Sequence, residues 1–276
     1  FRRGATEFLQ KPIDAVELEL RLRNVLAAKL HRDRLEQHAW ELEAEVARRS
    51  EELARAHVEV VECLARVGEY RDNETGRHTI RVGRYAEILA THLGMDREFV
   101  ARIRQAAPLH DIGKVGIPDA ILRKPGALDE LEFAHMRRHC EYGAEMCALH
   151  TDLAETRAAG HAAIGRLIGE SANSPVLRMA AMIAYTHHER WDGTGYPRQL
   201  KGEEIPIEGR ITAVADVFDA LTQSRPYKPA FSLEKSLGII REQSGSQFDP
   251  AVVEAMFAGL EQVVAVHYAC ADDRSA

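Results

Sequence analysis

Histidines placed at short spacing from carboxylates recur along the middle of this chain. Glu74 and His78 lie four residues apart, so one face of a helix would carry both side chains. His110 and Asp111 are adjacent and follow an apolar helical segment, where burying such a pair is costly unless a metal ion satisfies it. Imidazole and carboxylate groups are ligands of divalent transition metals. The pattern predicts a metal site.

Further candidates follow in the second half of the chain. His187 and His188 end another apolar helical segment, and two adjacent histidines can each present a ring nitrogen to neighbouring ions. Asp216 stands within the apolar run 211–219, so its carboxylate is either a ligand or a buried partner. Asp219, three residues on, is the less certain of this pair. Taken singly, each of these residues is more often an ordinary surface or core residue.

The elements that must position these side chains are predicted to be helices. From residue 68 on, helical patterns are separated by glycine and proline, and one long polar loop is expected at 193–206. Residues 35–67 contain no proline and carry apolar residues at heptad spacing, interrupted only by Arg49. This stretch predicts either a helix that pairs with its copy in a dimer or a single helix lying on its own domain.

Bulk composition fits a globular protein with one main domain and an appendage. The chain has 276 residues, of which 45% are hydrophobic and 29% charged, and a net charge of −7 argues against binding nucleic-acid polymers or anionic membranes. No apolar stretch approaches the roughly 20 residues that span a bilayer, and no signal peptide opens the chain. The four cysteines have neither zinc-knuckle spacing nor disulfide density. We therefore expect a cytoplasmic protein.

Taken in order, these motifs resemble the HD superfamily of metal-dependent phosphohydrolases. The sequences GKVGIPD at 113–119, KPG at 124–126, HHERWDGTGYP at 187–197 and RPYK at 225–228 narrow the resemblance to the HD-GYP family. It runs from about residue 67 to residue 256. It implies an all-α helical bundle of the HD-domain type, and an enzyme that hydrolyses cyclic di-GMP to linear pGpG or on to GMP.

The resemblance also implies a set of metal ligands. These are Glu74, His78, His110, Asp111, His187, His188 and Asp216, together with one more histidine. Two or three divalent ions are implied, iron or manganese before zinc, nickel or magnesium, and Glu74 has the position of a ligand to the third. Asp111 would bridge two ions, which lower the pKa of water for in-line attack on phosphorus.

Other positions are implied to contact the substrate. Lys114, Arg225 and Lys228 match positions that bind phosphate in the family, and their charges suit oxygens that become more negative in the transition state. Without the surrounding motifs they would be solvated surface cations. Asp111 and Lys114 are the expected catalytic residues, and the loop with Tyr196 and Pro197 is expected to form the pocket rim. That loop is also linked in the family to contacts with diguanylate cyclase domains.

Two candidates compete for the remaining histidine ligand. His139 begins the sequence HCEYG and His161 begins HAAIG, 22 residues further on, as a tandem duplication of 128–149 into 150–171 would produce. The spacing from His110 fits His139, whereas the spacing to His187 fits His161. We favour His139, because it follows the KPG loop as in the family.

The N-terminal residues resemble the last strand, Lys-Pro turn and final helix of a response-regulator receiver domain, with Lys11 at the phosphate-contacting position. An ordinary amphipathic helix is the alternative. We expect a receiver remnant at 1–30, a coiled-coil-like signalling helix at 31–66, the phosphodiesterase domain at 67–265 and a tail at 266–276. The expected partners are cyclic di-GMP, a second copy of the chain, a cognate histidine kinase and diguanylate cyclase domains. Two other functions stay open: hydrolysis of another cyclic nucleotide or dinucleotide, and a catalytically weak module that only binds partners.

Overall fold

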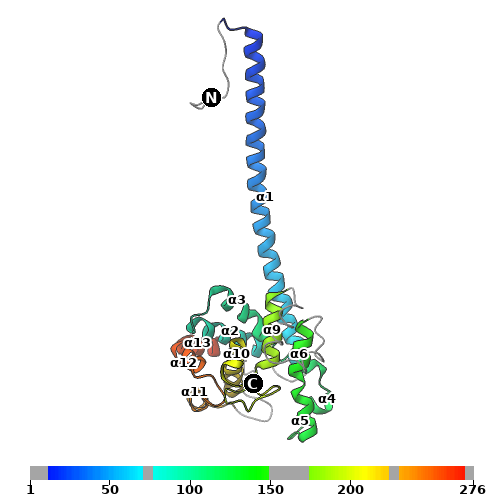
Figure 1. Ribbon diagram of the computed structural model, residues 1–276, viewed down its shortest axis with the longest axis vertical. Helices are drawn as coiled ribbons and strands as arrows, with labels where there is room; N and C mark the ends of the chain where they lie inside the picture. The colour runs from blue at the N-terminus through cyan, green and yellow to red at the C-terminus, as the bar shows by residue number, and fades with distance from the viewer. Residues whose placement is uncertain (1–11, 71–76, 149–173, 224–229, 271–276) are drawn as a thin grey trace, which may run out of the picture. The chain divides into compact units, whose positions relative to one another are not determined.

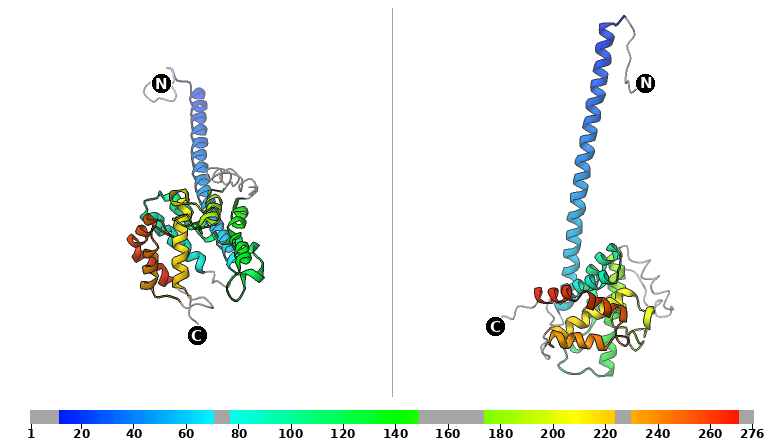
Figure 2. Two further views of the ribbon diagram at one scale, coloured as in Figure 1. Left: turned by 60° about the horizontal axis from the view of Figure 1, so that its bottom comes forward. Right: turned by 90° about the vertical axis from the view of Figure 1, so that its left-hand side faces the viewer.

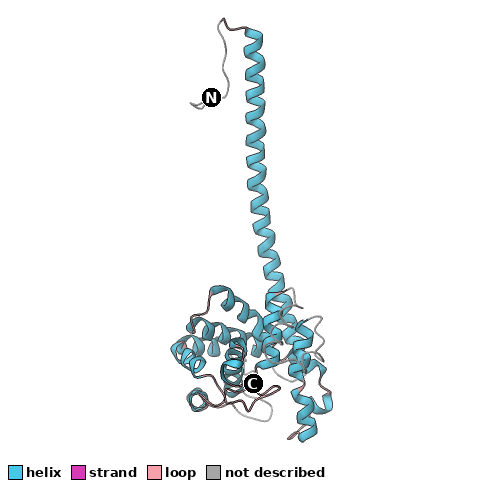
Figure 3. Ribbon diagram, in the orientation of Figure 1, coloured by secondary structure: helices cyan, strands magenta, loops and turns pink. Residues whose placement is uncertain are grey.

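All regular structure in the described part of the chain is helical. The computed structural model describes residues 12–70, 77–148, 174–223 and 230–270, and these contain α-helices and short 3-10 helices but no strand (Figure 1, Figure 3). One isolated bridge joins Ser244 to Phe248. The all-α fold expected from the sequence is confirmed. None of the described helices is long and apolar enough to cross a membrane.

The chain divides into two compact units, one ending at His57 and the other beginning at Val58. Helix α1, Ala15–Tyr70, makes up the first unit from Ala15 on and continues into the second. Ion pairs one turn apart, such as Arg21 with Glu17 at 2.9 Å and Arg48 with Glu52 at 2.7 Å, support its exposed surface. Residues of the apolar seam predicted by the heptad spacing are exposed among the described residues: Leu42 is 65% exposed, Val46 63% and Leu53 72%.

The second unit is a bundle of short helices around one apolar core. Its α-helices are α2 Arg77–His92, α3 Arg97–Ala106, α4 Asp119–Leu122, α5 Glu130–Arg137, α6 His139–Ala148, α9 Pro175–Thr186, α10 Ile207–Thr222, α11 Leu233–Glu242, α12 Pro250–Ala258 and α13 Leu260–Ala269. The 3-10 helices are η1 Ala107–Leu109, η2 Ile112–Gly116 and η3 Gly202–Glu204. Figure 2 shows α10 to α13 grouped together.

Helix α2 is central because it packs against α3, α10, α12 and α13, while α9 packs against α3, α6 and α10. The buried residues Val82, Tyr85, Ala86 and Leu89 recur at the spacing of one helix face, so α2 offers a continuous apolar stripe to its neighbours. Phe218 of α10 packs edge-on against the Tyr85 ring at 5.3 Å between ring centres. This contact fixes α2 beside α10, the two helices that carry His78 and Asp216 of the candidate site.

The last turns of α1 belong to the core of the second unit. Val61 is 4% exposed and Ala65 2%, and both pack in the main apolar cluster. The second compact unit begins at Val58, and the expected start of the catalytic domain at residue 67 stays a prediction. The heptad pattern continues across this boundary, so periodicity alone did not locate it.

Candidate metal centre

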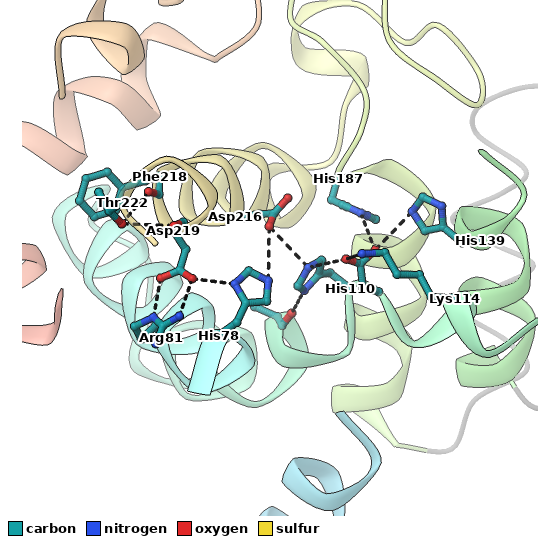
Figure 4. A network of polar contacts seen from close by, with 12 residues as sticks. His78, Arg81, His110, Lys114, His139, His187, Asp216, Phe218, Asp219 and Thr222 are labelled. Atoms are coloured by element: carbon teal, nitrogen blue, oxygen red, sulfur yellow. Dashed lines mark hydrogen bonds and ion pairs between the residues drawn. The ribbon is translucent and has the colours of Figure 1, made fainter. Parts of the chain in front are cut away.

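The structure brings most of the predicted ligands together in two adjoining clusters. The Asp111 cluster contains Asp111, His139, His187 and His188, and the Asp216 cluster contains His78, His110 and Asp216. Within each cluster, one ligand atom from every residue lies within 4.8 Å of the others. Figure 4 shows His139, His187 and Lys114 at one end of this network and His78 with Asp219 at the other.

Asp111 lies between the two clusters. Its Oδ2 atom is 3.2 Å from Nε2 of His110, while its Oδ1 atom is 3.4 Å from Nε2 of His139 and 3.7 Å from Nε2 of His187. In the other cluster, Oδ1 of Asp216 is 3.5 Å from Nε2 of His78 and 3.7 Å from Nε2 of His110. One carboxylate therefore presents an oxygen to each side, as a ligand shared by two ions would.

Close backbone packing draws these residues together. Gly113 on η2 lies against the start of α6, where an added Cβ atom would be 1.9 Å from the carbonyl oxygen of His139. Gly143 on α6 packs in turn against Ala184 of α9. Asp111 directly precedes η2, His139 begins α6 and His187 directly follows α9. Small residues at the contacts between these helices therefore bring the three ligands close to one another.

The imidazole rings are held in the tautomer that a metal needs. The Nδ1 atoms of His110, His139 and His187 lie 2.9, 2.7 and 3.0 Å from backbone carbonyl oxygens three or four residues earlier. A carbonyl oxygen only accepts hydrogen bonds, so each Nδ1 carries the hydrogen and each Nε2 keeps its lone pair. The three lone pairs belong to the atoms that face Asp111.

Several of these inward-facing atoms lack a hydrogen bond. Nε2 of His110, Nε2 of His187 and Oδ1 of Asp111 are buried, and none has a hydrogen-bond partner of suitable geometry among the described residues. Buried polar groups left in this state cost about 1–3 kcal/mol each. Divalent metal ions would satisfy all of them, and a mixed imidazole and carboxylate set suits iron, manganese or zinc. The residues present fit a metal centre.

Burial and nearby charges hold His139, His188 and Asp111 in their metal-binding forms, whereas Asp111 raises the pKa of His110 against the effect of burial. Burial lowers the pKa of His139 to about 4 and the pKa of His188 well below its usual value, so both rings are neutral near pH 7. Burial acts to raise the pKa of Asp111, but nearby positive charge, above all the Lys114 ammonium, lowers it. Nζ of Lys114 lies 2.8 Å from Oδ2 of Asp111. An ionised carboxylate and neutral imidazoles are what a cation binds without displacing protons.

The predicted rim loop folds back on the histidine pair. The Tyr196 ring stacks on His188 with 4.7 Å between ring centres. Behind it, the buried Glu189 carboxylate accepts hydrogen bonds from the backbone N–H groups of Arg198 at 2.7 Å and Leu200 at 3.0 Å. Sequence reasoning placed Tyr196 and Pro197 at the rim but gave Glu189 no role, since its partners are backbone groups that no motif reveals.

A second supporting group lies behind His78. Nδ1 of His78 contacts Oδ2 of Asp219 at 2.7 Å, and Asp219 in turn pairs with Arg81. The sequence favours Asp216 over Asp219 as a ligand and gives Arg81 no role. Spacing could have indicated this pair, because Arg81 follows His78 by three residues on α2, as Asp219 follows Asp216 on α10.

Some predicted site residues lie outside the described part of the chain. These are Lys11, Glu74, His161, Arg225 and Lys228. The choice between His139 and His161, the third metal position and two of the three phosphate contacts therefore stay predictions.

Comparison with known proteins places the chain in a family. A profile described as "HD domain" matches residues 62–252. Among relatives, a cyclic di-GMP phosphodiesterase of Thermotoga maritima is 42% identical over 268 residues, covering 95% of this chain and 67% of the relative. The cyclic di-GMP phosphodiesterase response regulator RpfG of Xanthomonas campestris is 38% identical over 260 residues, covering 94% of this chain and 63% of the relative.

A 3'3'-cGAMP-specific phosphodiesterase 2 of Vibrio cholerae is 40% identical over 214 residues, covering 78% of this chain and 37% of the relative. The chain thus spans between 37% and 67% of the length of these three relatives. The profile match includes every residue of the two clusters and the helices that carry them, and this chain belongs to the HD domain family.

Proposed function

We propose that this chain is a metal-dependent phosphodiesterase that hydrolyses cyclic di-GMP to linear pGpG or on to GMP. The observation that carries the proposal is the pair of clusters joined by Asp111, with buried ligand atoms facing inward that no described protein group satisfies. Two ions so close together suit an in-line displacement at phosphorus, where both the attacking and the leaving oxygen need stabilisation.

Each cluster would hold one ion. His78, His110 and Asp216 would bind the first, and Asp111, His139, His187 and His188 the second, with Asp111 contacting both. Divalent ions held there would lower the pKa of water and neutralise charge on a phosphate oxygen. Iron and manganese are the proposed metals, and Glu74 is the proposed ligand to a third ion.

The chain's own residues would then bind and orient the substrate. The Lys114 ammonium beside Asp111 would stabilise negative charge that develops on the phosphate. Tyr196, stacked on His188, would form one wall of the pocket, with Pro197 next to it. Arg225 and Lys228 are proposed as further phosphate contacts on the strength of the RPYK sequence alone.

Support for the substrate comes from relatives named for cyclic di-GMP hydrolysis that align with 94–95% of the chain. The relative named for 3'3'-cGAMP, 40% identical, makes that dinucleotide the second candidate. A module that only binds partners is disfavoured, because it would bury unsatisfied imidazole and carboxylate atoms with no gain.

We further propose that an upstream receiver domain regulates the enzyme in response to a histidine kinase, with residues 1–30 as its last part. The response regulator among the relatives supports this. The signalling helix would pair with a second copy through its exposed heptad seam. The rim loop with Tyr196 and Pro197 would contact diguanylate cyclase domains.

We also propose that the protein is cytoplasmic. All four cysteines are free thiols, which suits the reducing cytoplasm: Cys63, Cys140, Cys147 and Cys270.

A substrate panel tests the proposed activity. Protein purified without oxygen and loaded with Mn²⁺ or Fe²⁺ would be incubated with cyclic di-GMP, 3'3'-cGAMP and cyclic di-AMP, and products would be separated by chromatography. We expect the highest kcat/KM for cyclic di-GMP, with pGpG or GMP formed and no turnover after chelation. Fastest turnover of 3'3'-cGAMP would select the second candidate, and no turnover of any dinucleotide would refute the enzymatic proposal.

A further inference from the structure

A buried network behind His78 sets it apart from the other ligands. The Asp219 carboxylate is 1% exposed and lies between α2 and α10. Its Oδ2 atom accepts a hydrogen bond from Nδ1 of His78 at 2.7 Å. Arg81 donates from Nε to Oδ1 at 2.7 Å and from Nη2 to Oδ2 at 2.9 Å, so it grips both carboxylate oxygens (Figure 4).

This arrangement fixes the carboxylate from two sides. Arg81 is itself only 1% exposed, and its Nη1 atom donates to the carbonyl oxygen of Cys270 at 3.0 Å, at the end of α13. A guanidinium bound to both oxygens leaves Asp219 little freedom to rotate. Its remaining hydrogen bond then fixes the His78 ring, with Nε2 turned towards Asp216 at 3.5 Å.

The support of His78 differs in kind from that of its neighbours. His110, His139 and His187 donate from Nδ1 to neutral backbone carbonyl oxygens, whereas His78 donates to a charged carboxylate. A carboxylate partner makes the imidazole a stronger base at the other nitrogen and so a better ligand, and losing such a partner typically costs about 10- to 100-fold in metal affinity. Only the Asp216 cluster has this support among the described residues.

We propose that Asp219 and Arg81 are positioning residues for the Asp216 cluster, which orient and strengthen His78 as a ligand to one ion without acting on the Asp111 cluster. The inference rests on the proposed metal centre. It predicts that a change at Asp219 weakens the binding of one ion and leaves the other unchanged. A general loss of stability would not distinguish the two ions.

The chain contains a matched control. Asp249 is 4% exposed and pairs with Arg210 at 2.6 Å, but it caps α12 and contacts no histidine of either cluster. Asp219→Asn and Asp249→Asn both replace a buried, arginine-paired carboxylate by an amide of the same shape. Both should lower the melting temperature, because each leaves an arginine without its counter-charge.

The experiment is a titration of the metal-stripped 276-residue chain with Mn²⁺. Bound ions per chain and free Mn²⁺ are followed by electron paramagnetic resonance, and thermal unfolding is measured alongside. Asp219→Asn is expected to weaken one of two ions by about 10- to 100-fold and to leave the other within about twofold. Asp249→Asn is expected to bind both ions as the parent does. Arg81→Lys, which keeps the charge but cannot hold both oxygens, is expected to weaken the same ion.

Parent-like affinity for both ions in Asp219→Asn, or equal weakening of both, would overturn the inference. Should that variant fail to fold, Arg81→Lys decides the question by the same two readings. If the parent protein itself binds no Mn²⁺, the proposed metal centre fails first and the inference falls with it.

Discussion

Replacing Gly113 by alanine should damage the metal centre although no ligand residue is replaced. Gly113 lies on η2, two residues after Asp111, and packs against the first turn of α6. An added Cβ atom would be 1.9 Å from the carbonyl oxygen of His139 and 2.4 Å from the backbone nitrogen of Gly143. Both obstacles are backbone atoms, so no side-chain rotation can relieve the clash.

The size of the effect follows from these distances. Real Cβ contacts essentially never fall below 3.0 Å, so η2 and α6 must separate by about 1 Å or more. Ligand distances in a metal site hold to within about 0.2 Å, and a misplacement of about 1 Å costs on the order of 100-fold in rate. Overpacking of this kind also costs about 1–3 kcal/mol of stability. We expect loss of one bound ion and about a 100-fold lower kcat.

Gly238 supplies the control. It lies in α11, an alanine Cβ atom there would meet nothing within 4 Å, and the backbone conformation is ordinary. Gly238→Ala should keep metal content and turnover and gain up to about 1 kcal/mol of stability. Metal content by mass spectrometry, turnover of cyclic di-GMP and helical circular dichroism would be compared for both variants. Unchanged metal and turnover in Gly113→Ala would refute the reasoning.

Three further predictions concern the ligand register, the helix and the rim loop. His139→Ala should strip one ion and lower turnover by orders of magnitude, whereas His161→Ala should change stability within about 0.5 kcal/mol; the reverse result would show that our register for 128–171 is wrong. The heptad seam of 35–67 should make the protein a parallel dimer. Light scattering that reports a monomer at tens of micromolar would count against it. Removing residues 1–57 should leave a monomeric catalytic unit. Glu189→Ala should lower the unfolding free energy by about 1–3 kcal/mol, because two backbone N–H groups lose their acceptor. Glu189→Gln should cost less. Equal unfolding temperatures for the two variants would show that Glu189 does not hold the rim loop through these hydrogen bonds.

The sequence was enough to predict the fold class and which side chains meet. Scarce β-branched alternation and frequent helical periodicity predicted an all-α protein, and the order of the histidine and aspartate motifs selected residues that the structure brings within 4.8 Å of one another. Their role as ligands stays a prediction. These residues could be found because each belongs to a short local motif whose chemistry is evident from residue type.

The supporting shell could not be predicted in the same way. Arg81 and Asp219 are 138 residues apart in sequence, and their pairing depends on how α2 packs on α10. Glu189 acts on backbone N–H groups, which every residue except proline has, so its partners leave no mark in the sequence.

The heptad pattern also could not show which residues of α1 pack in the core of their own chain. Val60 is 58% exposed while Val61 is 4% exposed, so the exposed seam and the buried face run side by side on the same helix turns. A heptad pattern cannot tell which apolar residue meets the core of its own chain and which remains for a partner. Only tertiary packing separates the two.

Asp111→Ala is the sharpest test of the metal centre, because Asp111 presents an oxygen to each of the two clusters and no other carboxylate among the described residues does so. The measurement is metal content together with cyclic di-GMP turnover on the same anaerobic preparation, with circular dichroism to verify the helices. We expect a folded protein that has lost bound metal and retains less than about 1% of the parent turnover. A folded variant that keeps its metal and hydrolyses the dinucleotide at a rate near that of the parent would contradict it.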